Sequence, residues 1–197
     1  MRVISADDLH RVLDYASLID RLDAYFRSGN TRQEHVHYPV NAPGGAEATL
    51  IMMPCWEEGA YIGVKIVNVF PDNGARGLPT IMATYVLSSG ETGEPLAMLD
   101  GNTLTARRTA SASALASRYL SRPSAARLVM VGTGVLAKHL IGAHATARPI
   151  ADVKVWGRSP EKAEAVAESL NSEKLRVTAT SDLEAAVAEA DIISAAT

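Results

Sequence analysis

The segment after residue 127 constrains the fold most, because short apolar runs and helix-like runs alternate there. Strand-length runs occupy residues 128–131, 153–156, 175–179 and 191–196, and helix-like runs occupy residues 135–146, 160–170 and 182–188. Strands that alternate with helices form a parallel sheet covered on both faces. This part of the chain therefore predicts an α/β fold with a doubly wound parallel sheet.

The first strand of this array runs directly into a glycine turn. In "LVMVGTGVLAKHL", Gly132 and Gly134 precede a helical pattern, and Ala137 follows at the third position of a G-x-G-x-x-A fingerprint. In this context the first glycine makes a tight turn, the second admits a pyrophosphate, and the helix N-terminus carries partial positive charge. The alternative is a purely structural bend. The three βα units that follow favour a Rossmann-type dinucleotide site.

The end of the second predicted strand indicates which dinucleotide. An NAD site usually has an acid about 20 residues beyond the glycines, where it holds the ribose hydroxyls. Here Gly157 takes that place and Arg158 and Ser159 follow, which favours the 2′-phosphate of NADP(H) and leaves NAD(H) open. We expect Gly157 and Arg158 to lie at an exposed strand end. The alternative is that Arg158 is a solvated loop residue and Ser159 only a helix cap.

Residues before the linker "SRPSAARL" have a different pattern. Two helices are predicted in the first 30 residues, four strands between residues 49 and 100, and one long helix over residues 101–120. We therefore place an α+β domain over residues 1–122 and the nucleotide-binding domain over residues 123–197.

Helix starts are predicted from side chains that can accept a backbone hydrogen bond. Ser5 with Asp8 indicates the first helix, Asn102 or Thr103 caps the long helix, and Ser159 with Pro160 starts helix 160–170. Ser181 with Glu184 predicts a capping box for the last helix.

Three cations in the first domain are candidates for chemistry. Lys65 lies inside the apolar run "YIGVKIVNVF", so it is either a buried ammonium that needs an anion or a solvated residue on an edge strand. Arg107 and Arg108 open the long helix, where a guanidinium suits a substrate carboxylate. A solvated pair is the common alternative, so we expect one of the two arginines to be functional.

Four segments together carry a resemblance. "GVKIVNVFPDN", "DGNTLTARRTASASALA", "VMVGTGV" and "ADIISAAT" are similar, in order and over essentially the whole chain, to the ornithine cyclodeaminase/mu-crystallin family. The resemblance implies a substrate-binding and dimerisation domain followed by a Rossmann NAD(P)-binding domain, and a homodimer. It also implies amine or imine redox chemistry on amino-acid substrates.

The resemblance assigns roles to single residues. Lys65 matches the active-site lysine and Arg108 the arginine that binds the substrate carboxylate. Thr80 matches a cofactor-contacting threonine, and Val135 and Leu136 lie where the backbone meets the pyrophosphate. The family often has an arginine in the segment that here reads "QEHVHYP", so His35 takes the place of a second substrate contact.

The implied function is an NAD(P)-dependent oxidoreductase that acts on the C–N bond of an amino acid or cyclic imino acid. Ketimine reductase and ornithine cyclodeaminase are the two leading activities. The alternatives are a non-catalytic, NADPH- or ligand-binding protein similar to mu-crystallin, and an alanine dehydrogenase. The family continues beyond the position of Thr197 and places a catalytic aspartate there, so we expect this chain to be part of a longer product.

Composition excludes several other classes. With a net charge of −3 and no block of Lys or Arg, we expect no nucleic-acid partner. One cysteine leaves a cysteine-rich metal site without ligands, so no metal is expected. No apolar run approaches the roughly 18 residues of a membrane span, and a cytoplasmic location is expected.

Overall fold

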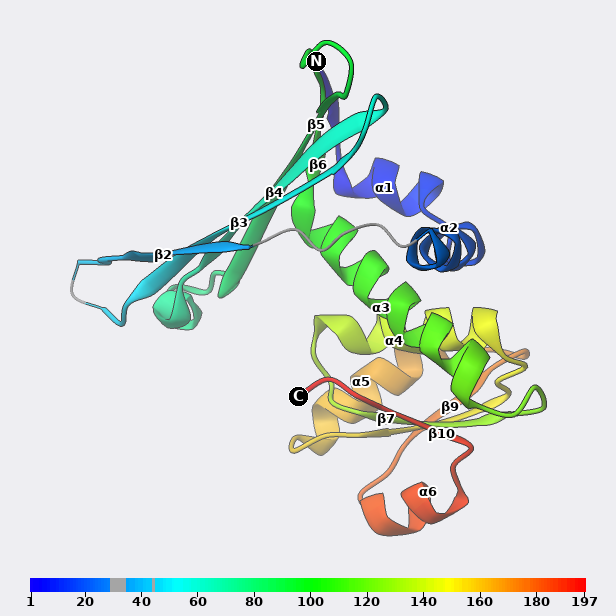
Figure 1. Cartoon of the computed structure of the whole chain (residues 1–197). Coiled ribbons are helices and arrows are strands. Elements are labelled where there is room, and N and C mark those ends of the chain that lie inside the picture. Colours follow the sequence, from blue (N-terminus) through cyan, green and yellow to red (C-terminus); the bar gives the residue numbers. More distant parts are fainter. Residues whose placement is uncertain (29–34, 44) are drawn as a thin grey trace. The chain divides into compact units, whose positions relative to one another are not determined.

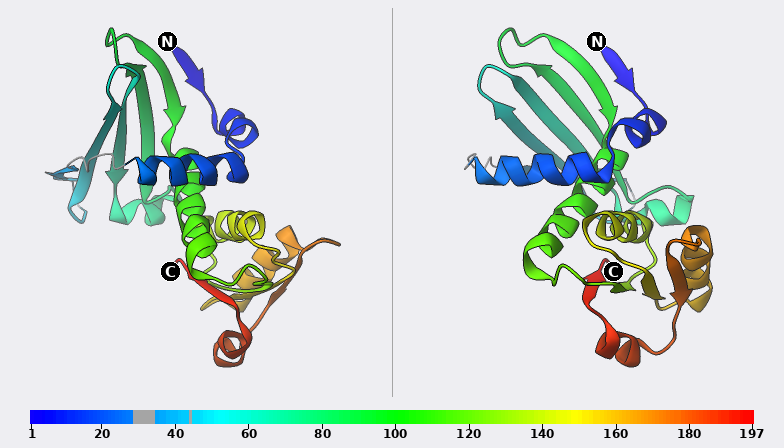
Figure 2. Two further views of the ribbon diagram at one scale, coloured as in Figure 1. Left: turned by 45° about the vertical axis from the view of Figure 1, so that its right-hand side comes forward. Right: turned by 90° about the vertical axis from the view of Figure 1, so that its right-hand side faces the viewer.

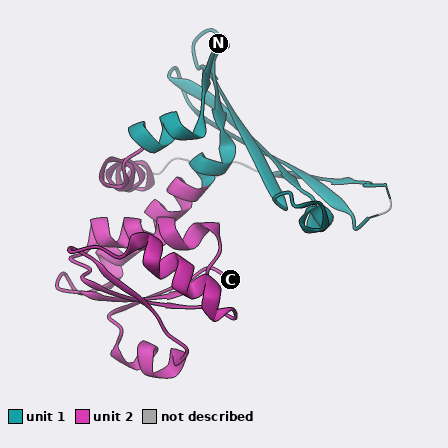
Figure 3. Ribbon diagram, turned by 180° about the vertical axis from the view of Figure 1, so that it is seen from behind, with its two compact units in different colours: residues 1–12, 30–105 teal, residues 13–29, 106–197 magenta. Residues whose placement is uncertain are grey.

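A computed structural model describes residues 1–28, 35–43 and 45–197 and divides into two compact units (Figures 1 and 3). Unit 1 comprises residues 1–12 and 30–105, and unit 2 comprises residues 13–29 and 106–197. The long helix α3, Gly101–Leu120, has its first turn in unit 1 and its remainder in unit 2. None of the helices in the described ranges has the length and apolar content that a membrane crossing requires.

Unit 1 is built on a six-stranded sheet in the order β1-β6-β5-β4-β3-β2, seen from two sides in Figure 2. All neighbours are antiparallel except β1 and β6, which are parallel. The strands are β1 Arg2–Ile4, β2 Val36–Val40, β3 Ala48–Glu57, β4 Tyr61–Val69, β5 Ile81–Ser89 and β6 Pro95–Asp100. The four strands predicted between residues 49 and 100 are confirmed. The two edge strands, β1 and β2, were not predicted.

The short helices of unit 1 follow local signals. Helix α1, Ala6–Val12, begins as predicted, because Ser5 Oγ accepts a hydrogen bond from the Asp8 backbone N–H and the Asp8 carboxylate accepts one from the Ser5 N–H. Its Leu9 is buried. A 3₁₀ helix, Pro71–Arg76, links β4 to β5 and ends at Gly77, whose φ of 68° is a left-handed conformation that suits glycine.

Unit 2 contains a four-stranded parallel sheet in the order β10-β7-β8-β9. Figure 1 shows helices α4 and α5 on one side of this sheet and α6 on the other, which confirms the doubly wound arrangement. The elements are β7 Arg127–Val131, α4 Val135–Ala147, β8 Asp152–Trp156, α5 Pro160–Leu170, β9 Arg176–Ala179, α6 Leu183–Glu189 and β10 Ile192–Ala195. Strand order reverses between β7 and β10, so a topological switch point lies there.

The core of unit 2 consists of aliphatic side chains from the sheet and its helices. Met130, Val153 and Val155 on the strands and Ile141 on α4 are fully buried. Helix α2, Tyr15–Arg27, contributes Ile19 to the same cluster. At about 25 cal/mol per Å² of apolar surface, burial of this cluster is the main term that stabilises the unit.

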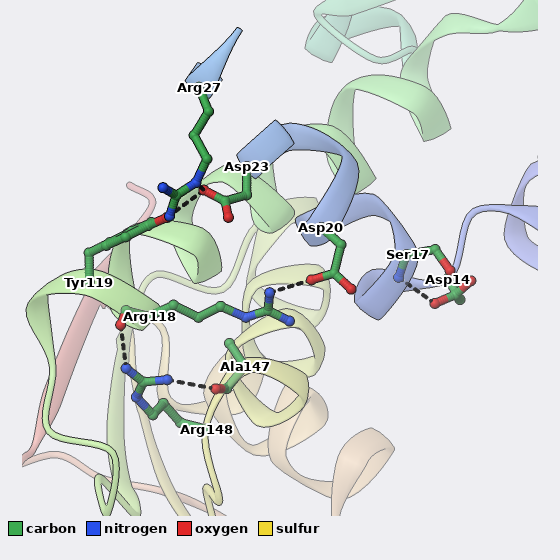
Figure 4. Close-up of polar contacts among 9 residues, drawn as sticks. All are labelled: Asp14, Ser17, Asp20, Asp23, Arg27, Arg118, Tyr119, Ala147 and Arg148. Atoms are coloured by element: carbon green, nitrogen blue, oxygen red, sulfur yellow. Dashed lines mark hydrogen bonds and ion pairs between the residues drawn. The ribbon is translucent and has the colours of Figure 1, made fainter. Parts of the chain in front are cut away.

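Polar contacts attach α2 and α4 to α3 within unit 2 (Figure 4). Arg118 on α3 forms an ion pair with Asp20 on α2, and Arg148 after α4 donates a hydrogen bond to the Arg118 carbonyl oxygen. These contacts place α2 and most of α3 in the same compact unit as the parallel sheet. The boundary between functional domains after residue 122 stays a prediction.

Of the four predicted helix caps, two are wrong and two, Ser5 with Asp8 and Ser159, are confirmed. Helix α3 begins at Gly101, and its Thr103 N–H donates to Asp100 Oδ1 at 2.7 Å, so Asp100 replaces Asn102 or Thr103 as the capping side chain. Helix α6 is capped by Asp182, which accepts from the Ala185 N–H at 2.9 Å, in place of the Ser181–Glu184 box. Ser159 caps α5 as predicted. In both errors a carboxylate near the expected position makes the contact instead.

Candidate functional site

An open pocket of about 800 Å³ lies at the carboxyl ends of β7, β8 and β10. This is where ligands bind in open α/β sheets, next to a topological switch point. Its lining residues are Gly132, Thr133, Gly134, Trp156, Gly157, Arg158, Ser159, Lys162, Ala196 and Thr197. The pocket brings together the predicted glycine turn and the predicted phosphate site.

The backbone at Gly132 requires a glycine. Its φ is 119°, and a Cβ built there would lie 2.1 Å from the Ala196 backbone oxygen. The Gly132 N–H donates to the Trp156 carbonyl oxygen at 2.8 Å, which ties the turn to the end of β8. A close approach to both neighbouring strands therefore explains the first glycine.

Gly134 has no such constraint, because its φ of −75° is one that any residue adopts. It precedes α4 as the N-cap residue, and a Cβ built there would meet no atom within 4 Å, so the turn faces open space. A helix N-terminus beside such space suits an anion, because its first N–H groups lack intrahelical partners. Val135, in the first turn of α4, is 81% exposed and Leu136 is half-buried, while Ala137 is fully buried against the sheet.

Cations gather at the end of β8. Arg158 is exposed, and Lys162 in the first turn of α5 lines the same pocket. Ser159 Oγ accepts a hydrogen bond from the Lys162 N–H and donates one to Glu161 at 2.6 Å, an interaction that lowers the pKa of Glu161. Among the described residues that line the pocket, no side chain is acidic. The donor set fits a phosphorylated dinucleotide.

The expectation of an exposed strand end is wrong for Gly157. Gly157 is half-buried, and a Cβ built there would lie 2.6 Å from Thr133 Cγ2. A side chain at position 157 would therefore conflict with Thr133.

Lys65 lies on a central strand. Strand β4 pairs with β3 and β5, and Lys65 faces Met53 and Tyr85 across those ladders. The alternative of a solvated lysine on an edge strand is wrong. Lys65 is half-buried, and its Nζ donates to Thr105 Oγ1 in the first turn of α3 at 3.4 Å.

Tyr85 completes the surroundings of Lys65 in unit 1. A Cβ built on Gly63 would lie 1.7 Å from the Tyr85 hydroxyl oxygen, so the phenol occupies the space that a side chain at position 63 would fill. Burial raises the pKa of Tyr85, and the Cys55 thiol adds to this effect. The phenol is therefore protonated at neutral pH and can donate a hydrogen bond.

The two arginines of α3 have different environments. Arg107 Nη1 donates to the Leu13 carbonyl oxygen, and its guanidinium lies 5.0 Å from the centre of the Tyr15 ring. Arg108 is exposed. A structural role for Arg107 agrees with the expectation that only one of the pair is functional, while the substrate contact of Arg108 stays a prediction.

The remaining candidates lie in unit 1. His35 is exposed and directly precedes β2, and Thr80 is exposed directly before β5, where its carbonyl oxygen accepts from the Phe70 N–H at 2.8 Å. Their contacts with ligands stay predictions. Within the ranges that the structure describes, no three His, Cys, Asp or Glu side chains form a group suited to a metal ion.

Several residues of these sites were not identified from the sequence. Thr133, Trp156 and Lys162 line the pocket, and Thr105 and Tyr85 lie beside Lys65. Of these residues, only Lys162 could have been identified from the sequence, because it is a cation four residues after Arg158, in the first turn of the predicted helix. Tyr85 is recognised only once the register of β4 and β5 is known.

Comparison with known proteins gives consistent matches. A model of the ornithine cyclodeaminase/mu-crystallin family matches residues 3–197. The Delta(1)-pyrroline-2-carboxylate reductase of Colwellia psychrerythraea is 37% identical over 201 residues, which cover 100% of this chain and 63% of that protein. The resemblance inferred from four sequence segments is thus confirmed.

Two solved structures share the fold. Delta(1)-pyrroline-2-carboxylate reductase of Thermococcus litoralis, in complex with NADH and L-proline, matches with a TM-score of 0.87 and 26% identity, over 100% of this chain and 62% of that one. A lysine cyclodeaminase matches with a TM-score of 0.84 and 32% identity, over 100% of this chain and 60% of that one. The chain thus spans less than two thirds of the length of each of these relatives.

Proposed function

The chain belongs to the ornithine cyclodeaminase/mu-crystallin family, and from this premise we propose that it forms part of an NAD(P)-dependent reductase of a cyclic α-imino acid. The observation that carries the proposal is the pocket at the carboxyl ends of β7, β8 and β10, with its glycine turn and its two cations. Relatives named Delta(1)-pyrroline-2-carboxylate reductase support this substrate class.

Different residues of the pocket bind different parts of the cofactor in this proposal. The turn from Gly132 to Gly134 and the N–H groups at Val135 and Leu136 bind the pyrophosphate. The family resemblance assigns Thr80 a further contact with the cofactor. When bound, the nicotinamide dinucleotide supplies or accepts a hydride at the substrate carbon. Trp156 and Gly157 leave room for the adenosine ribose at the end of β8.

NADP(H) is the preferred cofactor in this proposal. Arg158 and Lys162 offer two cations to a 2′-phosphate beside the N-terminus of α5. Ser159 can contact the phosphate only by giving up the hydrogen bond that its hydroxyl donates to Glu161. Position 157 has no acid that would repel the phosphate or hold the ribose of NAD. The solved NADH complex of the Thermococcus litoralis relative keeps NAD(H) as the alternative.

The family resemblance assigns substrate binding to Arg108 and Lys65. Arg108 holds the carboxylate through its planar guanidinium, with His35 as a second contact, and Lys65 contacts the carboxylate or handles a proton near the reacting carbon. Reduction adds a hydride to the carbon of the C=N bond and a proton to its nitrogen, which gives the cyclic amino acid. Lys65, held by Thr105 beside a protonated Tyr85, is suited to deliver that proton.

Turnover of a cyclic ketimine acid tests the proposal. Purified protein is mixed with NADPH and Δ1-pyrroline-2-carboxylate, and loss of the cofactor absorbance is followed while L-proline is measured. Loss of absorbance that matches proline formation is expected. NADPH binding without turnover of any cyclic ketimine acid would instead favour a non-catalytic, mu-crystallin-like ligand-binding protein.

A cyclodeaminase is the second candidate activity, because the lysine cyclodeaminase structure matches at 32% identity. Such an enzyme would convert ornithine to proline and release ammonia without net consumption of NADPH. Ammonia release from ornithine therefore distinguishes it from the reductase, and oxidation of alanine by NAD(P)⁺ distinguishes an alanine dehydrogenase.

We also propose a homodimer that buries the outer face of the unit 1 sheet. Alternation along the strands places five exposed apolar side chains on one face of β2, β3 and β4: Val36, Tyr38, Met52, Trp56 and Ile62. Trp56 is 51% exposed and lies opposite Ile62 in the ladder. An exposed apolar face of this kind is typical of a subunit interface. In a dimer with two-fold symmetry, the apolar face of each subunit is covered by the same face of the other.

A further inference from the structure

Thr133 is the middle residue of the glycine turn, and its side chain occupies the space above Gly157. A Cβ built on Gly157 would lie 2.6 Å from Thr133 Cγ2, 3.3 Å from Oγ1 and 3.5 Å from Cβ. Cβ atoms essentially never come within 3.0 Å of another group, whereas 3.5 Å is an ordinary van der Waals distance. Only the branch of Thr133 beyond its Cβ therefore conflicts with a side chain at position 157.

The branch cannot easily move away. Threonine fills two of the three staggered positions around its Cα–Cβ bond, so only one rotamer leaves hydrogen where Cγ2 now lies. The backbone of the turn is also fixed, because Gly132 approaches Ala196 on one side and donates to Trp156 on the other. A larger residue at position 157 must therefore displace Thr133 or distort the end of β8.

The steric conflict between Thr133 and a side chain at position 157 lies at the end of β8, the second strand of the parallel sheet in chain order. Dinucleotide-binding domains distinguish NAD from NADP at this position. An acid at the end of the second strand holds the ribose hydroxyls of NAD, whereas its absence together with a cation suits a 2′-phosphate. Arg158 and Lys162 line the pocket at this end. We propose that Thr133 is a cofactor-specificity residue, which keeps position 157 free of a side chain and so leaves the ribose end of the pocket to these two cations. The proposal rests on the nicotinamide-dinucleotide function proposed above.

A set of paired variants tests the role of Thr133. Gly157→Asp is made in the parent, in Thr133→Ala and in Thr133→Val, and the dissociation constants of NADH and NADPH are measured by fluorescence titration. Alanine keeps only the Cβ, which is 3.5 Å away, whereas valine keeps a branched side chain without the hydroxyl. The valine background therefore separates loss of space from loss of a hydrogen bond.

We expect Gly157→Asp to tighten NADH binding at least about twofold more in the Thr133→Ala background than in the parent, because residues in contact couple by this amount or more. The valine background should behave like the parent. Equal effects of Gly157→Asp in all three backgrounds would overturn the proposal.

Thermal stability measured without cofactor separates the steric role of Thr133 from the proposed dinucleotide-binding function. Gly157→Ala adds only the Cβ, and it should lower the melting temperature more in the parent than in the Thr133→Ala background. Equal losses in both backgrounds would contradict the steric role of Thr133. A parent protein that binds neither NADH nor NADPH would contradict the proposed function instead, whatever the outcome of this comparison.

Discussion

At the scale of single residues, Arg107 and Arg108 differ in what surrounds them. Arg107 donates to a backbone carbonyl and lies over the Tyr15 ring, whereas Arg108 is exposed. We predict that Arg107→Lys lowers the stability of unit 2 by about 1 kcal/mol, roughly 3 °C in melting temperature, because an ammonium loses the planar contact. Thermal unfolding followed by circular dichroism measures this.

The neighbouring substitution serves as the matched control. Arg108→Lys should change stability by less than about 0.5 kcal/mol but weaken substrate binding, because an ammonium cannot hold a carboxylate bidentately. A loss of substrate affinity in Arg107→Lys, with none in Arg108→Lys, would show that the functional assignment within this pair is wrong.

Some features of the candidate site could be predicted from the sequence, and others depend on contacts between distant residues. The glycine turn was predictable because each glycine and the flanking strand and helix are local signals. The burial of Lys65 stayed open, because a central strand and an edge strand have the same apolar neighbours in sequence and only the pairing with β3 and β5 distinguishes them. The contact between Thr133 and Gly157 joins two turns that are distant in sequence, so no local pattern contains it.

At the scale of helices and strands, the start of α6 depends on one capping side chain. Asp182 Oδ1 accepts from the Ala185 N–H, whereas Ser181 was the predicted cap. We predict that Asp182→Ala destabilises α6 by about 1 kcal/mol and that Ser181→Ala stays within about 0.5 kcal/mol. Hydrogen exchange of the α6 amides measures both, and faster exchange in the serine variant alone would restore the sequence-based assignment.

The packing of α3 on α4 includes one buried histidine. His144 is 2% exposed, and its Nδ1 and Nε2 lie 3.0 and 3.3 Å from the hydroxyls of Ser117 and Ser113. Burial lowers the pKa of His144 from 6.5 to about 4. The folded protein therefore keeps a neutral imidazole at pH values where the unfolded chain is already protonated.

The low pKa of His144 makes the folded protein less stable in acid. Below pH 6.5 the unfolded state binds a proton that the folded state does not, so stability falls as the pH drops from about 6.5 to 4, by on the order of 3 kcal/mol in total. Urea unfolding at several pH values should show this loss in the parent and a flatter profile in His144→Gln. Equal slopes in both proteins would mean that other groups cause the acid sensitivity.

Element prediction failed mainly at the edges of the first sheet. Strand β2 contains Pro39, which is unfavourable in a central strand but tolerated at an edge, and β1 has only three residues. Both strands exist because long-range pairing with β3 and β6 stabilises them. The strands and helices of unit 2 were predictable because apolar runs and helix-like runs alternate regularly along the chain there.

At the scale of the whole molecule, the exposed face of the unit 1 sheet is expected to be covered by a second copy. Trp56→Arg should place a charge on this apolar face and shift the protein from dimer to monomer, because an unpaired buried charge is costly. Sedimentation velocity measures the change. Leu120→Arg, at a residue 86% exposed on α3, is the control and should leave the dimer intact. A parent protein that is already monomeric would contradict the interface.

We propose that the pocket at the glycine turn binds a nicotinamide dinucleotide and recognises the 2′-phosphate of NADP(H) through Arg158. The most direct test measures the dissociation constants of NADPH and NADH for the parent, for Arg158→Leu and for the exposed control Arg21→Leu. A charge-assisted contact contributes about 1.5–3 kcal/mol, so the parent should bind NADPH roughly tenfold to a hundredfold more tightly than NADH. Arg158→Leu should remove most of that difference while NADH binding and the Arg21→Leu control stay unchanged. Equal affinity of the parent for NADH and NADPH would contradict the phosphate site, and binding of neither would contradict the dinucleotide pocket itself.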